Sequence, residues 1–220
     1  MLEIKCFEFG PFQTNTYVVH DAKHVLIVDP ACYMQYEQQQ LYRYIEDLRL
    51  KIADFQLTIL ATHGHLDHLW GAAWACEQWH TPVLMHEADI PMAKAMQAQY
   101  DLFGIGGTPV PFPLEPLPVN QSVSPSIHHS AAEPRLIPSL TILPTPGHTP
   151  GSVCFYFPED GVLFSGDTLF QMGYGRTDLP GGDIQQLWHS LDLLLALPPE
   201  TVVYPGHGAP TTIAAERRRW

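Results

Sequence analysis

Four potential metal ligands lie within six consecutive residues, and this cluster constrains the fold more than any other part of the sequence. His63, His65, Asp67 and His68 come directly after an apolar strand pattern at 56–62 and just before a helical pattern. In an extended segment, side chains two residues apart project to the same side, so His63 and His65 can face one point. Asp67 and His68, at the start of a helix, can face a second point beside it. The sequence therefore predicts a metal site on a strand-to-helix loop, although any one of these histidines alone would be interpreted as an exposed loop residue.

Three further potential ligands each follow an apolar strand pattern and a glycine. They are His148, Asp167 and His207, in the turns Pro146-Gly147-His148, Ser165-Gly166-Asp167 and Pro205-Gly206-His207. Glycine before the ligand allows a sharp bend of the backbone, so a side chain at the end of a strand can point into a shared cleft. Together with the first cluster, these turns supply five histidines and two carboxylates. Seven ligands are suited to two ions that share one bridging carboxylate.

The order of the predicted elements favours a layered α/β fold. Strands are expected at 3–9, 15–20, 24–29, 56–62, 82–86, 140–144, 152–157, 162–165 and 201–204. Helices are expected at 36–50, 69–79, 87–103 and 184–195, the last with Asp183 as its N-cap, and a short helix is expected at the C-terminus. Two sheets with helices on their outer faces fit this order better than one doubly wound sheet.

The stretch at 104–138 differs from the rest of the chain. It contains eight prolines between Pro109 and Pro138 and has little apolar periodicity, so regular structure is not expected before Leu140. We interpret it as an insertion within a single domain spanning 1–220, serving as a substrate flap or an oligomer contact. His128 and His129 lie in it and are interpreted as exposed loop residues rather than ligands.

Composition excludes several classes of partner. The chain has 220 residues and a net charge of −12, from 23 acidic and 11 basic residues, which disfavours nucleic acid as a partner. No apolar run approaches the length of a membrane span, and the N-terminus alternates like a strand instead of resembling a signal peptide. The four cysteines are scattered and form no Cys-x-x-Cys pair. A reduced, cytoplasmic protein that uses neither nucleic acid nor a membrane is expected.

The ligand motifs resemble those of the metallo-β-lactamase-fold hydrolases. Residues 62–68, Thr-His-Gly-His-Leu-Asp-His, match the family's HxHxDH motif, and the three glycine turns match its later ligand motifs in order. The resemblance implies a four-layer αββα sandwich with the site at the edge between the two sheets. It also implies that one metal is held by His63, His65 and His148, and a second by Asp67, His68 and His207, with Asp167 as the bridge. Asp29 matches a position that supports the metal loop; alternatively, it is a simple turn aspartate.

Within that superfamily, the chain is most similar to the small glyoxalase II-like hydrolases. The similarity lies in Gly166-Asp-Thr-Leu-Phe170 and in the stretch from Gly175 to Asp183, which includes Arg176 and Asp178. Glyoxalase II enzymes carry Lys and Tyr at these two positions and Tyr at Ala209. We expect Arg176 either to bind a substrate carboxylate or to pair with Asp178 or Asp183.

The resemblance and the ligand set together predict an enzyme. Imidazole and carboxylate ligands are typical of zinc, with iron or manganese as alternatives. Two divalent ions ~3.5–4 Å apart would lower the pKa of a shared water towards ~7. The hydroxide formed, positioned by Asp67 and Asp167, would attack the carbonyl of a small-molecule thioester. The alternative hypothesis is a mononuclear iron persulfide dioxygenase, since that family also carries the HxHxDH motif and a Gly-Arg-Thr-Asp stretch.

Overall fold

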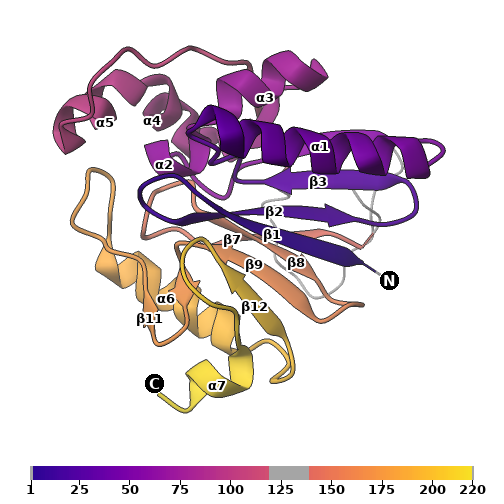
Figure 1. The fold of residues 1–220 in the computed structure, drawn as a ribbon. Helices are drawn as coiled ribbons and strands as arrows, with labels where there is room; N and C mark the ends of the chain where they lie inside the picture. The colour runs from indigo at the N-terminus through magenta and orange to yellow at the C-terminus, as the bar shows by residue number, and fades with distance from the viewer. Residues whose placement is uncertain (1, 119–138, 220) are drawn as a thin grey trace.

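The computed structural model describes residues 2–118 and 139–219, which form two β-sheets between two layers of helices (Figure 1). The first sheet has the strand order β1 (Glu3–Phe9), β2 (Thr14–His20), β3 (His24–Val28), β4 (Gln56–Leu60), β5 (Val83–Met85), β6 (Leu114–Pro116). The second has the order β13 (Thr211–Thr212), β12 (Val202–Pro205), β9 (Val162–Gly166), β8 (Val153–Phe157), β7 (Thr141–Pro144). A small hairpin consists of β10 (Leu169–Phe170) and β11 (Gly173–Tyr174).

Helices cover the outer face of each sheet. On the first sheet lie α1 (Gln35–Lys51), α2 (Leu66–Leu69), α3 (Ala72–Trp79), the 3₁₀ helix η1 (Glu87–Asp89), α4 (Ile90–Lys94) and α5 (Met96–Phe103). On the second lie α6 (Ile184–Leu195) and α7 (Ile213–Arg217). No helix in the described part of the chain is long and apolar enough to cross a membrane. These layers confirm the predicted αββα sandwich.

The alternation of side chains along the strands builds three separate apolar layers. In β3, Val25 and Ile27 pack towards the helices of the first sheet, whereas Leu26 and Val28 face the second sheet. In β8, Phe155 lies between the sheets and its neighbour Cys154 packs towards α6. Every residue of β2 and β8 is buried, because both sheets are covered on both faces. The inner apolar layer therefore holds the two sheets together.

The start of α6 confirms one sequence prediction in detail. Asp183 is the N-cap, and its Oδ1 accepts hydrogen bonds from the amides of Gln185 at 2.8 Å and Gln186 at 3.1 Å. These bonds satisfy two of the amides that a helix leaves without an internal partner at its N-terminus. The buried stripe of this helix includes Leu187, Leu191 and Leu194, as its periodicity predicts, whereas Trp188, which falls at the same apolar spacing, is 52% exposed.

The prediction that regular structure is absent between Gly104 and Leu140 is wrong at 114–116. This segment forms β6, which pairs in parallel with β5. Prolines are tolerated there because β6 is the edge strand, so the N–H groups that they lack are not needed by a further neighbour. The flanking bonds come from the Val83 amide to the Pro113 carbonyl, 3.0 Å, and from the Leu117 amide to the Met85 carbonyl, 2.8 Å. His128 and His129 lie outside the described residues.

The helices predicted at 69–79 and 87–103 are also interrupted. Gly71 separates α2 from α3, because its backbone lies against Cys32, where a Cβ would be 2.2 Å from Sγ, and its amide bonds to the Pro30 carbonyl at 2.8 Å. The second predicted helix is divided into η1, α4 and α5, with Pro91 in the first turn of α4 and a break at Ala95. Periodicity alone does not detect such breaks, since the apolar face continues through them.

Phe164 tests the inner layer. Its buried ring lies 5.0 Å from the ring of Tyr17 and 5.4 Å from that of Tyr204, so it touches both sheets. Phe164→Ala should lower the free energy of unfolding by about 3–5 kcal/mol, because it leaves a cavity between the sheets. Urea denaturation of the metal-free protein would measure this loss. Leu50→Ala, at a position 87% exposed on α1, is the control and should change stability by under about 0.5 kcal/mol. Equal effects of the two variants would contradict the assigned core.

Candidate metal centre

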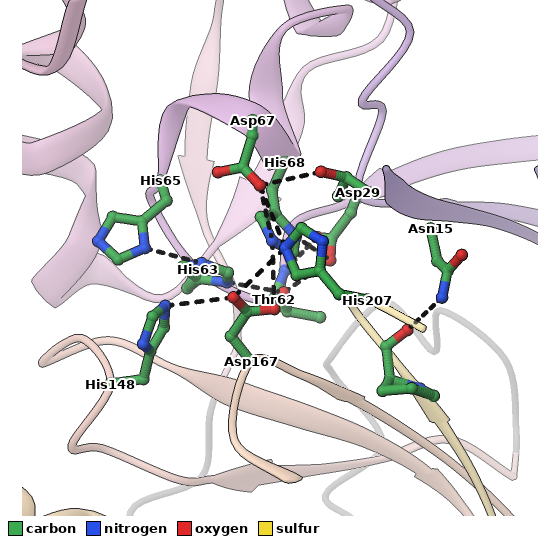
Figure 2. Close-up of polar contacts among 12 residues, drawn as sticks. Asn15, Asp29, Thr62, His63, His65, Asp67, His68, His148, Asp167 and His207 are labelled. Atoms are coloured by element: carbon green, nitrogen blue, oxygen red, sulfur yellow. Dashed lines mark hydrogen bonds and ion pairs between the residues drawn. The ribbon is translucent and has the colours of Figure 1, made fainter. Parts of the chain in front are cut away.

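The structure brings all seven predicted ligands together at one edge of the sandwich (Figure 2). His63 and His65 follow β4, Asp67 and His68 lie on α2, and the three glycine turns follow β7, β9 and β12. The side chain of His207 is 28% exposed, while the other six ligands are buried or nearly so. Within this cluster, ligand atoms lie within 4.8 Å of one another in three sets: His63, His65 and His148; His63, His68 and Asp167; Asp67, His68 and His207.

Asp167 lies between the two ligand sets that the resemblance implies. Its Oδ1 is 3.3 Å from His68 Nε2, and its Oδ2 is 3.5 Å from the Nε2 atoms of both His148 and His207. His68 Nε2, His148 Nε2 and Asp167 Oδ1 are buried, and no described residue gives them a hydrogen bond. Buried polar atoms are almost always satisfied, so these three point to a missing partner. A divalent cation has the chemistry to supply it.

Hydrogen bonds at the back of four imidazole rings fix which nitrogen faces the centre. The Nδ1 atoms of His148 and His207 bond to the carbonyl oxygens of Arg176 at 2.7 Å and Phe12 at 3.1 Å. A carbonyl only accepts, so each Nδ1 carries the proton and each Nε2 keeps its lone pair. His65 is the exception: its Nδ1 faces the centre, 3.1 Å from His63 Nε2.

Asp29 supports the remaining two rings, so the interpretation of this residue as a simple turn aspartate is wrong. Its Oδ2 accepts from His68 Nδ1 at 2.9 Å and from the hydroxyl of Thr62 at 2.7 Å, and its Oδ1 accepts from the Thr62 amide at 2.7 Å. Because the Thr62 hydroxyl donates to Asp29, its oxygen is free to accept from His63 Nδ1, 3.0 Å away. One buried carboxylate therefore orients His68 directly and His63 through Thr62.

The protonation states suit cation binding. Burial, reinforced by the neighbouring rings of His68 and His148, lowers the pKa of His63 well below its ordinary value. Burial and His148 lower the pKa of His65 to about 3, so both rings are neutral and carry a lone pair at neutral pH. Burial by itself would raise the pKa of Asp67 and of Asp167, but the charges and hydrogen bonds of the surrounding residues, with His68 the strongest, together outweigh it and lower both. Burial would lower the pKa of His68, but the surrounding carboxylates raise it, and the pKa of His207 is raised as well. Because neutral imidazoles and ionised carboxylates are the forms that bind divalent metals, a cation that binds at these two rings displaces their protons.

The glycines before the ligands act by two different means. Gly147 has a φ of +134°, a conformation that side chains rarely adopt, so it supplies the predicted bend. Gly206 is needed for space instead: a Cβ there would lie 2.3 Å from Asp167 Oδ1 and 2.7 Å from His68 Cε1. The backbone of the last turn therefore passes directly against one ligand from another glycine turn and one from α2.

Two side chains of β2 hold that last turn in place. The Nδ2 group of Asn15 donates to the carbonyls of Pro205 at 3.0 Å and Gly208 at 2.9 Å, and the Tyr17 hydroxyl donates to the Pro205 carbonyl at 2.7 Å. Nearby, the Thr14 hydroxyl donates to Asp67 Oδ2 at 2.9 Å. These residues were not predicted, because the sequence pattern of a fully buried strand does not indicate which of its polar side chains reach the site.

Arg176 and Asp178 lie beside the centre, but their side chains are not among its buried atoms. The guanidinium bonds to both carboxylate oxygens of Asp178, at 2.6 and 2.7 Å, and the two side chains are 54% and 67% exposed. This pairing, one of the two arrangements predicted for Arg176, lowers the pKa of Asp178 to about 2. The backbone of Arg176 contributes separately, because its carbonyl orients His148.

The profile of the metallo-β-lactamase superfamily matches residues 9–207, a range that contains every ligand of the centre. The chain belongs to the metallo-β-lactamase superfamily. Among members of the superfamily, the "probable metallo-hydrolase YqgX" of Bacillus subtilis is 35% identical over 210 residues, covering 94% of this chain and 91% of that protein. The hydroxyacylglutathione hydrolase GloC of Haemophilus influenzae is 34% identical over 224 residues, covering 99% and 96%.

A solved structure that is similar in fold was determined with metal bound. The crystal structure of TTHA1623 in a di-iron-bound form matches with a TM-score of 0.80 and 34% identity, covering 97% of each chain. Together with the histidine and aspartate cluster, this similarity identifies a potential metal site in a fold whose relatives include metallo-hydrolases.

Gly206→Ala tests the close approach at the last turn. The added methyl group would displace Asp167 or His68, so we expect the protein to bind less zinc per chain than the unchanged protein does. Elemental analysis after dialysis against zinc would measure this. Gly173→Ala is the matched control, because a Cβ there meets no atom within 4 Å and the backbone conformation is ordinary. Unchanged zinc content in Gly206→Ala would contradict the described packing.

Proposed function

We propose that this chain is a hydrolase that uses two divalent metal ions, with zinc as the expected metal and iron or manganese as alternatives, to cleave a thioester. The observation that carries the proposal is the position of Asp167, whose two carboxylate oxygens reach histidines of both ligand sets. One ion would be held by His63, His65 and His148. The other would be held by Asp67, His68 and His207, with Asp167 shared between them.

The residues of the centre have different roles in the proposed reaction. When bound, two divalent ions lower the pKa of a water molecule and withdraw electrons from a carbonyl oxygen. Asp67 and Asp167 stay ionised, so each can accept a hydrogen bond from the attacking water and hold it in line with the carbonyl. Thr14 fixes the orientation of Asp67 through its hydroxyl. The buried back of the site keeps the imidazole rings from rotating away.

A thioester is the substrate class that this arrangement favours. A thiolate leaves readily, so cleavage requires no strong general acid on the side of the leaving group. The similarity to the hydroxyacylglutathione hydrolase GloC over nearly the whole chain supports the same class. No serine or cysteine nucleophile is needed, and Cys154, which is buried, has a pKa raised by burial to about 12, so its thiol remains protonated.

One observation favours a second candidate, a mononuclear iron persulfide dioxygenase. His63, His68 and Asp167 form one of the three close ligand sets, and two histidines with one carboxylate are the ligand type of non-haem Fe(II) oxygenases. Aerobic assay with glutathione persulfide separates the two functions. One iron per chain with persulfide-dependent oxygen uptake and no thioester cleavage would refute the hydrolase proposal.

Asp167→Ala tests the shared ligand. Loss of this carboxylate should abolish thioester hydrolysis and lower the number of bound metal ions, since it contacts both sets. Removal of metal from the unchanged protein by a chelator should also abolish activity, and added zinc should restore it. Added zinc should not restore activity to the Asp167→Ala variant. Glu159→Ala, an exposed change at the opposite end of β9, serves as the control. A fully active Asp167→Ala variant would rule out the shared-ligand arrangement.

We further propose that Arg176 recognises an anionic group of the substrate, and that Asp178 holds the guanidinium beside the centre until substrate binds. Arg176 is exposed beside the centre, and the only other basic residue between Lys94 and Arg217 is Arg135. Arg176→Ala should raise KM about tenfold and leave kcat nearly unchanged. The variant loses a charged hydrogen bond to the substrate that is made equally in the bound ground state and in the transition state. Asp178→Ala, which releases the guanidinium from its present partner, should not raise KM. Equal increases in both variants would show that the pair only stabilises the loop.

A further inference from the structure

A second buried carboxylate lies behind the centre, at a position that the sequence motifs do not mark. Asp89 is the last residue of η1 and is fully buried. Its Oδ2 accepts from the Gly64 amide at 2.8 Å and from the Thr149 hydroxyl at 2.6 Å. Its Oδ1 accepts from the Gly151 amide at 2.6 Å. The three donors satisfy a charge that would otherwise be costly to bury.

These donors belong to two loops that come from different sheets. Gly64 lies between His63 and His65 on the loop after β4, while Thr149 directly follows His148 on the loop between β7 and β8. Asp89 therefore bonds to the loop that carries two ligands and to the loop that carries the third. His63, His65 and His148 are one of the three close ligand sets.

The packing around Asp89 leaves no freedom in the spacing of these loops. A Cβ at Gly64 would lie 3.0 Å from the Asp89 carbonyl oxygen, and a Cβ at Gly151 would lie 2.7 Å from the Asp89 carboxyl carbon. The first loop is also held from its other side by Gln99. Its Nε2 donates to the Gly64 carbonyl and its Oε1 accepts from the Leu66 amide, both at 2.9 Å.

We infer that Asp89 is a positioning residue for one half of the metal centre, where it sets the distance between the His63 and His65 pair and His148. Asp29 acts on the other half through its direct bond to His68, and it reaches the first half only through Thr62 and His63. Residues that orient metal ligands typically contribute 10–100-fold to metal affinity. The inference rests on the metal binding proposed above and is independent of the substrate.

The test compares Asp89→Asn with Asp29→Asn, because both changes keep the size of the side chain and remove the charge. Zinc retained by the full-length protein would be measured against graded concentrations of a chelator, and the cobalt-substituted proteins would be examined by paramagnetic NMR. In Asp89→Asn, one of two ions should bind about 10–100-fold more weakly. The shifted signals of His63, His65 and His148 should change, while those of His68 and His207 persist. Asp29→Asn should instead change the signals of His68 and, through Thr62, of His63, while those of His65 and His148 persist.

Thr149→Val is a milder variant that keeps the test open if Asp89→Asn fails to fold. It removes one donor to Asp89 but, unlike Asp89→Asn, does not introduce a buried side-chain amide. The affinity for the same ion should therefore fall by a smaller factor. Unchanged affinity in these variants, or equal weakening of both ions, would overturn the positioning role even if thermal stability falls. An unchanged protein that binds no zinc would instead overturn the proposed function, and the inference with it.

Discussion

Five imidazole rings and two carboxylates, most of them buried, lie against one another, and the rest of the structure depends on keeping them there. Without a bound cation, three of their polar atoms are buried and receive no hydrogen bond from any described residue. Such a cluster is costly to assemble, so it requires rigid support from behind. That support is a set of hydrogen bonds at the back of four of the five rings, in which Asp29, Thr62 and two backbone carbonyls are the acceptors.

The sandwich supplies this support because its strands end together. β4, β9 and β12 are each followed by ligands, and in both sheets the chain leaves the strand at the edge between the layers. Ligands from the first sheet come early in the chain and ligands from the second come late. Only a fold that places these two groups of loops side by side can form the centre. The site is therefore a consequence of the relative position of the sheets, more than of any one loop.

The sequence was sufficient to predict the layers and the residues that gather at the centre, but among the residues that support them it indicated only Asp29. Histidines, aspartates and glycine turns are recognisable by residue type and spacing, and alternating apolar strands predict covered sheets. The acceptors behind His148 and His207 are carbonyl oxygens of Arg176 and Phe12, and any residue there could provide them. Asp89 resembles an ordinary acidic residue near a helix start. Strand β6 was missed because prolines argue against a central strand, whereas only the fold shows that 114–116 lies at an edge.

Polar as well as apolar contacts fix the position of the two sheets relative to each other. The inner apolar layer attracts the sheets but is non-directional, so it tolerates small displacements. Directional bonds cross between the sheets on two sides of the centre. Asp89 joins the loop after β4 to the loop between β7 and β8, and Asn15 and Tyr17 join β2 to the turn that carries His207. A relative displacement of the sheets would lengthen and weaken these directional bonds before it disturbed the core. The spacing of the metal ligands is therefore tied to the hydrogen bonds at the rim of the sandwich, and the core supplies the stability that keeps them formed.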